Sequence, residues 1–250
     1  MTNLLFFVYM GEYWQYYLLG IVLLPGLILA SWAQAKTMST YKKYRKVLSS
    51  KQITGAQAAE KILKAKGIFD VEVVRVSGSD LSDNYNPETK IVSPSPKVYD
   101  GTDIAALGIA AHECGHAIQH AEKYAPLRAR SALVKVSNIS SQFLWPLVII
   151  GIIFNFAYVG GIWGNIFMWS GVAFFGISII FSLITLPVEY NASKKALSLL
   201  VATDCVDAME VKGAKKVLSA AALTYVAALV VSMLSLVRFL LFIFLNSRKD

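Results

Sequence analysis

The chain has 250 residues, of which 56% are hydrophobic and only 16% are charged. A soluble domain usually carries about 25% charged residues, so this composition excludes an ordinary soluble domain and indicates an integral membrane protein. The formal net charge of +8 does not indicate a nucleic-acid partner. The basic residues lie beside hydrophobic segments, where they set topology and contact anionic lipid, and no nucleic-acid-binding motif is present. The two cysteines, Cys114 and Cys205, argue against a disulfide framework and fit a reducing compartment.

The N-terminal segment, residues 1–35, is predicted to contain the first membrane span over residues 16–35, with Pro25 as an expected kink. Its last residues, Ala33-Gln34-Ala35, resemble a signal-peptidase site. A signal peptide, however, has positive charge before its apolar core, whereas here the lysines and arginines follow the span. We therefore expect an uncleaved anchor whose N-terminus lies outside the cell.

Residues 36–140 are predicted to form a small cytoplasmic α+β body. The expected elements, in chain order, are a basic amphipathic helix at 36–51, a helix at 57–66 capped by Thr54, a strand at 71–76, a turn at 84–87, a strand at 90–93 and a helix from Thr102 or Asp103 to about Tyr124. Because Pro94 and Pro96 follow the second strand, we expect that strand at an edge of the sheet.

The 53 residues from Val136 to Val188 contain no Asp, Glu, Lys or Arg, which is too long for one membrane span and right for two. We expect a transmembrane hairpin at 141–188, with spans near 140–159 and 166–186. The expected turn contains Gly160, Gly161, Gly164 and Asn165. A cytoplasmic segment at 189–216 and a final part at 217–250, with the fourth span near 217–237, complete the chain.

The charge distribution orients these spans. Residues 36–135 hold sixteen Lys and Arg, residues 189–216 hold five, and the loop between the second and third spans holds none. The positive-inside rule therefore places the first two segments in the cytoplasm and the hairpin loop outside. Arg238, Arg248 and Lys249 fall on the outer side and oppose this orientation weakly, since Arg238 can extend to the interface.

The most specific pattern in the chain is H-E-x-x-H, formed by His112, Glu113 and His116. Residues four apart share a helix face, so the two imidazoles can hold one zinc ion while Glu113 reaches a water molecule bound to that ion. This pattern predicts a zinc hydrolase, with zinc as its cofactor.

A catalytic zinc site needs a third protein ligand. Cys114 points to roughly the opposite helix face, and His120 lies two turns from His112, about 12 Å along the axis. Glu189 is the better candidate, because it is the only acidic residue between Glu122 and Asp204. A lone carboxylate beside a long apolar segment needs a partner such as a metal ion, and the charge distribution puts Glu189 on the same membrane side as the histidines.

H-E-x-x-H followed by a distant glutamate resembles the gluzincin peptidases and, among membrane proteins, the HtpX-like and CAAX-prenyl endopeptidases. The chain resembles more closely the neutral, membrane-bound zinc metallopeptidases of the YugP type. The segments that carry this resemblance are 98–101 leading into 111–113, then 124–128, 186–193 and 221–228. The resemblance implies a zincin-like body in a bacterial plasma membrane, the ligands His112, His116 and Glu189, and Glu113 as the catalyst.

One position departs from the gluzincin pattern. Many gluzincins have an aspartate four residues after the ligand glutamate, where it holds a ligand histidine in one tautomer, and this chain has Ser193. Serine can accept the hydrogen bond without adding charge, and such partners tune metal affinity about 10–100-fold. Asp100, Asp103 and Asn191 are alternative partners, and Tyr225 is a candidate donor to the oxyanion.

The predicted protein is thus a mainly α, multi-pass membrane endopeptidase with about four transmembrane helices and its active site on the cytoplasmic side. Glu113 would act as general base on a zinc-activated water. Substrates would be peptides or membrane proteins near the bilayer, paired with the strand at 90–93 by strand addition. A membrane-protein partner or a homo-oligomer stays open.

The alternative is a non-catalytic membrane scaffold with a structural zinc. The presence of Glu113 favours the enzyme, because that residue is not a ligand. A zinc transporter is poorly supported, because the central spans hold no ionisable residue with which to pass an ion.

Overall fold

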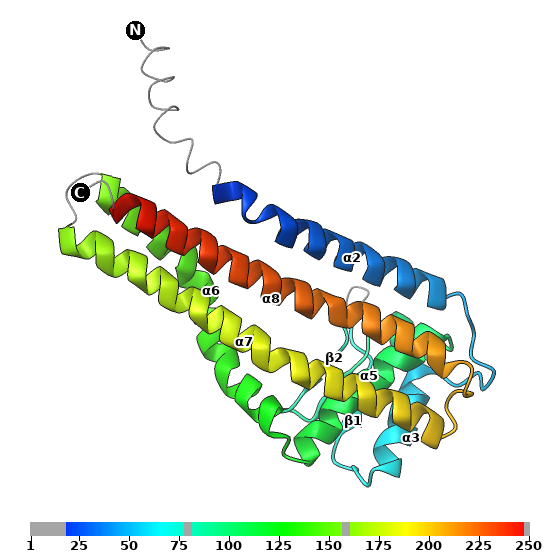
Figure 1. Cartoon of the computed structure of the whole chain (residues 1–250). Helices are drawn as coiled ribbons and strands as arrows, with labels where there is room; N and C mark the ends of the chain where they lie inside the picture. The colour runs from blue at the N-terminus through cyan, green and yellow to red at the C-terminus, as the bar shows by residue number, and fades with distance from the viewer. Residues whose placement is uncertain (1–18, 78–81, 157–160, 248–250) are drawn as a thin grey trace. The chain divides into compact units, whose positions relative to one another are not determined.

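The computed structural model describes residues 19–77, 82–156 and 161–247. They form helices and one small sheet (Figure 1). The elements are α2 (Leu24–Tyr44), α3 (Gly55–Ala65), β1 (Glu72–Val73), β2 (Asn84–Asn86), β3 (Ile91–Ser93), α4 (Pro96–Tyr99), α5 (Ile104–Ala121), α6 (Ala125–Phe156), α7 (Gly161–Ala202) and α8 (Val211–Ser247). The prediction of a mainly α chain with a few short strands is confirmed.

Four helical segments are long and apolar enough to cross a membrane: Leu19–Tyr44, Ala125–Gly151, Ile162–Ala202 and Val211–Leu245. Each contains or overlaps one of the four predicted spans. Residues 16–18 of the first predicted span and 157–159 of the second lie outside the described residues, as does Gly160 of the predicted turn.

The turn predicted at Gly164 and Asn165 is wrong, because both residues lie inside α7. A helix satisfies its own backbone hydrogen bonds, so in an apolar surrounding it persists through residues that would favour a turn in water.

The chain divides into two compact units. The first comprises residues 1–32, 132–183 and 227–250, and the second comprises residues 33–131 and 184–226. In the first unit α6, α7 and α8 pack through the buried side chains of Leu144, Val148, Met168, Phe175 and Phe239. Large apolar side chains such as Ile149, Trp169 and Ile180 are exposed, as expected for helices that face lipid.

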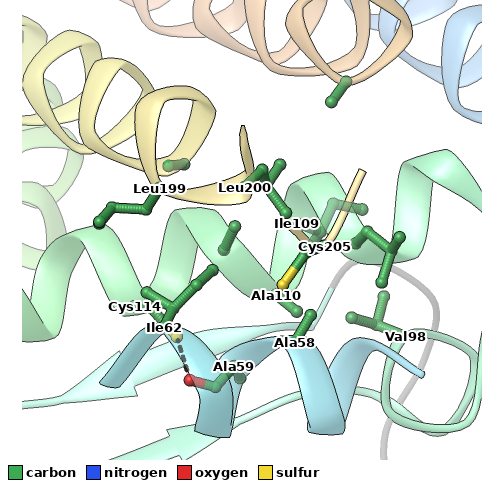
Figure 2. Close-up of a cluster of buried hydrophobic side chains, with 14 of the residues drawn as sticks. Ala58, Ala59, Ile62, Val98, Ile109, Ala110, Cys114, Leu199, Leu200 and Cys205 are labelled. Atoms are coloured by element: carbon green, nitrogen blue, oxygen red, sulfur yellow. Dashed lines mark hydrogen bonds between the residues drawn. The ribbon is translucent and has the colours of Figure 1, made fainter. Parts of the chain in front are cut away.

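The second unit is built around α5, which contacts α3, α4, β2 and β3. Figure 2 shows part of its core, in which Ile62 of α3 and Leu200 of α7 lie with Cys114 of α5. Thr54 forms the predicted cap of α3: its hydroxyl accepts a hydrogen bond from the Gln57 backbone, and the Gln57 side chain bonds back to Thr54. Asp103 caps α5 by accepting a hydrogen bond from the Ala106 backbone at 3.0 Å.

The sheet order is β1-β3-β2, with β1 parallel and β2 antiparallel to β3. The edge position predicted for the strand at 90–93 is therefore wrong, and both sides of β3 are occupied. Pro94 does not interrupt the pairing, because it lies after the strand and its carbonyl accepts a hydrogen bond from Val76. Strand addition of a substrate at β3 is accordingly excluded as a binding mode.

Two local predictions also need correction. Residues 84–86 form β2 in place of a turn, and the turn follows at 87–90, where the Asn86 side chain accepts a hydrogen bond from the Glu88 backbone. Tyr85 explains this choice, because its hydroxyl reaches His120 on α5 at 2.8 Å and such a tertiary contact outweighs turn propensity. The helix predicted at 36–51 ends at Tyr44, after which Leu48 forms a bridge with Asp103.

Candidate active site

Helix α5 carries His112, Glu113 and His116 on its course through the second unit. It is rich in alanine, and Ala105, Ala106 and Ala111 are fully buried. Small side chains let neighbouring elements approach the helix closely.

Glu189 of α7 meets both imidazoles. His112 Nε2 lies 3.1 Å and His116 Nε2 lies 3.6 Å from the same carboxylate oxygen, Glu189 Oε2. The two rings stand edge to face with their centroids 4.7 Å apart. One ligand atom from each residue lies within 4.8 Å of the others, so the three side chains converge on one point.

The second oxygen of Glu189 faces a cation. Arg130 of α6 approaches Glu189 Oε1 at 3.2 Å, and Tyr225 of α8 lines the same cleft as Glu189. Glu189 is only 2% exposed, and burying a carboxylate is costly unless it is paired. Arg130 therefore orients the carboxylate so that Oε2 faces the histidines.

Each histidine is held through its other ring nitrogen. His112 Nδ1 lies 3.1 Å from Ser193 Oγ, and His116 Nδ1 lies 3.0 Å from Gln119 Oε1. An amide oxygen only accepts hydrogen bonds, so His116 donates from Nδ1, and its Nε2 is the ring nitrogen directed toward Glu189. The same arrangement holds at His112 when the Ser193 hydroxyl accepts.

Gln119 connects the two helices. Its amide nitrogen donates to the Val188 carbonyl at 2.8 Å and to Asn191 Oδ1 at 3.0 Å. The side chain is fully buried, and both ends of its amide are satisfied. Gln119 thereby fixes His116 and the backbone just before Glu189 with one planar group.

Glu113 lines a cleft of about 320 Å³ with His112, Glu189, Ser193 and Tyr225. Its side chain is buried, and burial raises the pKa of this carboxyl above its ordinary value. For His116, burial acts to lower the pKa, but the hydrogen bond to Glu189 and the charge of Glu113 outweigh it and raise the pKa.

Sequence comparison relates the whole chain to known proteins. The family model described as "Putative neutral zinc metallopeptidase" matches residues 19–244. The chain belongs to this family. It is also 42% identical over 228 residues to the "Putative membrane protease YugP" of Bacillus subtilis (strain 168), an alignment that covers 91% of this chain and 96% of that protein. No solved structure matches the chain.

The four apolar helices indicate a membrane protein, and the relative from Bacillus subtilis is described as a membrane protease. The resemblance to YugP-type metallopeptidases, found from sequence motifs, is confirmed. The donor set also fits the metal that the family description names. Two neutral imidazole nitrogens and one carboxylate oxygen are the ligands that catalytic zinc takes in His₂Glu sites, and each imidazole has a hydrogen-bond partner on its other nitrogen, as ligand histidines generally do.

The residues singled out from the sequence separate into two groups. His112, Glu113, Glu189, Ser193 and Tyr225 line the cleft. His116 lies behind them against Glu189, and Asn191 is linked to His116 through Gln119. Asp100 pairs with Arg75, and Asp103 caps α5, so neither carboxylate takes the place of the missing aspartate. His120 bonds to Tyr85, and Cys114 lies in the core with its sulfur 3.6 Å from the Ala59 carbonyl (Figure 2).

Three residues of the site were not anticipated. Gln119 could have been found, because it lies three positions after His116 and shares its helix face. Arg130 lies beyond the turn that ends α5, so no helical spacing relates it to the motif. Asp83 lines the same cleft and accepts a hydrogen bond from the Ser95 backbone at 2.7 Å, but a carboxylate in a loop carries no local signal of its destination.

Proposed function

We propose that this protein is a zinc-dependent membrane endopeptidase, with His112, His116 and Glu189 as zinc ligands and Glu113 as general base. The observation that carries the proposal is the convergence of both Nε2 atoms on one oxygen of Glu189, with each Nδ1 held by a separate partner. Histidines that packed only as core residues would not need two preset tautomers directed at one buried carboxylate.

A bound zinc ion would supply Lewis acidity, which acidifies water and polarises a carbonyl group. Glu113 lies in the cleft beside the ligands and would take the proton from the attacking water and then pass it to the leaving amine. Its burial suits this role, because a raised pKa makes the carboxylate a stronger base near neutral pH. Tyr225, on the facing helix, is the candidate donor to the oxyanion.

The location of the cleft suggests its substrates. Gln34 and Thr37 of α2 and Tyr225 of α8 line it, and these helices are candidate membrane spans. We propose that substrates are peptides or membrane proteins cut near the bilayer surface. The excess of Lys and Arg in residues 36–135 and 189–216 favours the cytoplasmic side of a bacterial plasma membrane. The five-segment division of the chain, with a cytoplasmic body at 36–140, stays a prediction.

The test compares purified wild-type protein with Glu113→Gln in detergent. Bound zinc per chain and cleavage of a mixed library of membrane-derived peptides are measured on both. We expect about one zinc in each protein, because Glu113 is not a ligand, and cleavage only by the wild type. A third variant, Glu189→Gln, should lose zinc as well as activity.

The other outcomes are equally informative. If both proteins hold zinc and neither cuts any peptide, the chain is a scaffold with a structural metal. If the wild type holds no zinc, the proposed ligand set is wrong. If Glu113→Gln cuts as fast as the wild type, Glu113 is not the base.

A further inference from the structure

A second concavity lies on the second unit, between the C-terminal part of α7 and the N-terminal part of α8. This groove has a volume of about 700 Å³. Its lining residues are Tyr190, Ser193, Lys194, Leu197, Ser198 and Val201 of α7, Ala208 of the connecting loop, and Val211, Lys212, Lys215, Leu218, Ser219 and Ala222 of α8. We refer to it as the α7–α8 groove.

One face of α7 forms a wall of the groove. On α7, Tyr190, Leu197 and Val201 recur at helical spacing and face the groove. The adjacent face of α7 carries Ala196 and Leu200, which are fully buried in the core. Both faces of this part of α7 therefore bear apolar side chains, although one face alone would suffice to pack the helix.

The rim of the groove is positively charged. Lys194, Lys212 and Lys215 are exposed and line it. Lys212 contacts the sulfur of Met209, and within the described ranges none of the three forms an ion pair with a carboxylate. This contrasts with Lys51, Lys90 and Lys195, each of which pairs with an acidic side chain. An apolar floor with a cationic rim is complementary to an apolar ligand that carries negative charge.

The groove adjoins the candidate active site. Ser193, Leu218 and Ala222 line both the α7–α8 groove and the catalytic cleft. Ser193 also contacts the ring of His112 at 3.1 Å. The groove and the cleft are therefore neighbours, and an extended chain bound in the groove would lie close to the proposed zinc ligands.

We propose that the α7–α8 groove binds the part of the substrate that flanks the scissile bond, and that it selects apolar segments bearing acidic residues. This inference rests on the proposed peptidase function and adds the substrate class to it. Lys194, Lys212 and Lys215 are then specificity-determining residues, and the apolar floor holds the side chains between the acidic residues and the cleaved bond. An anionic lipid has similar chemistry, but the residues shared with the cleft favour a ligand that reaches the catalytic groups.

The test measures binding separately from cleavage. Full-length Glu113→Gln protein, loaded with zinc in a neutral detergent, is titrated with two fluorescent peptides of the same apolar sequence, one ending in three glutamates and one in three lysines. We expect the acidic peptide to bind about 10-fold more tightly, since each exposed pair contributes modestly. Lys212→Glu combined with Lys215→Glu should reverse that preference. Lys216→Glu is the matched control, because Lys216 is exposed on the same helix but does not line the groove, and it should leave the preference unchanged.

Each failure has its own signature. Equal affinity for the two peptides, or an equal effect of Lys216→Glu, overturns the groove proposal. Binding of phosphatidylglycerol in place of either peptide would make the groove a lipid site and also overturn it. Cleavage by the otherwise wild-type enzyme is measured in parallel: a charge preference in binding without any cleavage refutes the peptidase function alone, and cleavage with no charge preference refutes the groove alone.

Discussion

Hydrogen bonds outside the proposed ligand set orient the rings of the two histidines. Ser193 stands where many gluzincins have an aspartate, and its hydroxyl lies 3.1 Å from His112 Nδ1. A hydroxyl orients the ring but adds no charge, so the basicity of His112 is enhanced less than a carboxylate would enhance it. The compensating negative charge comes from the ligand side, where Glu189 is buried and anchored by Arg130.

Of the two histidine partners, Gln119 makes more hydrogen bonds than Ser193. Gln119→Leu would remove the acceptor of His116 and leave the Val188 carbonyl and Asn191 without their donor. We expect zinc affinity to fall about 10–100-fold and the free energy of unfolding to fall by about 1–3 kcal/mol, because buried polar groups lose their partners. Competition with a fluorescent chelator and thermal unfolding of the metal-free protein measure the two effects.

Ser193→Ala is the matched comparison for Gln119→Leu. It also removes a histidine partner, but Ser193 is only half-buried and supports no backbone carbonyl. Zinc affinity should fall while stability changes little. A stability loss in Ser193→Ala equal to that of Gln119→Leu would mean that the two residues do not differ in the way their contacts imply.

Asp103 gives a pH dependence that is independent of the metal. Burial raises the pKa of this carboxyl above its ordinary value of 3.8, although the hydrogen bond from Ala106 and the charge of Arg45 oppose the shift. Protonation of Asp103 is therefore favoured in the folded state. The stability that this group contributes is fully present below its unfolded pKa and is lost as pH rises through its folded pKa. Asp103→Asn keeps an acceptor for the cap and removes the ionisation. The melting temperature of the variant minus that of the wild type should therefore increase as pH rises from about 4 to about 7.

The control for Asp103→Asn is Asp70→Asn. Asp70 is exposed, and the hydrogen bond and charge of Lys90 lower the pKa of its carboxyl. The melting temperature of this variant minus that of the wild type should therefore decrease as pH rises. If both variants moved in the same direction, the shift at Asp103 would not be governed by burial.

At the scale of elements, the crossing of α5 and α7 brings the proposed ligands together, and a glycine inside the H-E-x-x-H motif permits it. A Cβ atom on Gly115 would lie 2.6 Å from the Ala192 carbonyl oxygen and 3.0 Å from the Ala192 Cα. These are backbone atoms, so they cannot turn away as a flexible side chain could. The two helices would have to separate between His112 and His116 on one side and Glu189 on the other.

Gly115→Ala should therefore destabilise the protein by about 1–3 kcal/mol, as overpacking does, and should weaken zinc binding in the same variant. Gly176→Ala is the control on α7, because a Cβ atom added there would meet nothing within 4 Å and alanine favours a helix by about 1 kcal/mol. Unfolding temperature and zinc stoichiometry are measured on both. Normal zinc binding by Gly115→Ala would show that the crossing is not as tight as these distances require.

The elements also show why some features are readable from sequence and others are not. The caps at Thr54 and Asp103 follow from local rules, and the approach of His112, His116 and Glu189 was foreseen because few polar residues were available to meet. The strand order could not be predicted, because β1 and β3 are distant in sequence and the presence of Pro94 gives no information on whether they pair. Arg130 and Asp83 were missed for the same reason: their positions depend on how separate elements pack.

At the scale of the whole molecule, single helices serve two purposes. Helix α7 contributes Phe175 to the apolar core of the first unit and Glu189 to the site in the second, and α8 contributes Phe239 and Tyr225 in the same way. The proposed ligand Glu189 is therefore carried by a candidate membrane span. If Glu189 holds zinc as proposed, a helix that crosses the membrane fixes the metal relative to the bilayer, which would favour substrates that are themselves held at the bilayer.

The side of the membrane on which the cleft lies can be decided with two cysteine variants. Thr89 is exposed in the turn between β2 and β3, and Ile162 is 71% exposed in the first turn of α7. The native Cys114 and Cys205 are fully buried, so they should react slowly with an impermeant maleimide and leave a low background. Because the Lys and Arg residues cluster in 36–135 and 189–216, the positive-inside rule predicts that Ile162→Cys is labelled on intact cells and Thr89→Cys only after the membrane is permeabilised. The reverse pattern would put the catalytic cleft outside the cell, where the substrates would be exported proteins. Labelling of both Thr89→Cys and Ile162→Cys on intact cells would contradict a membrane span between these two positions.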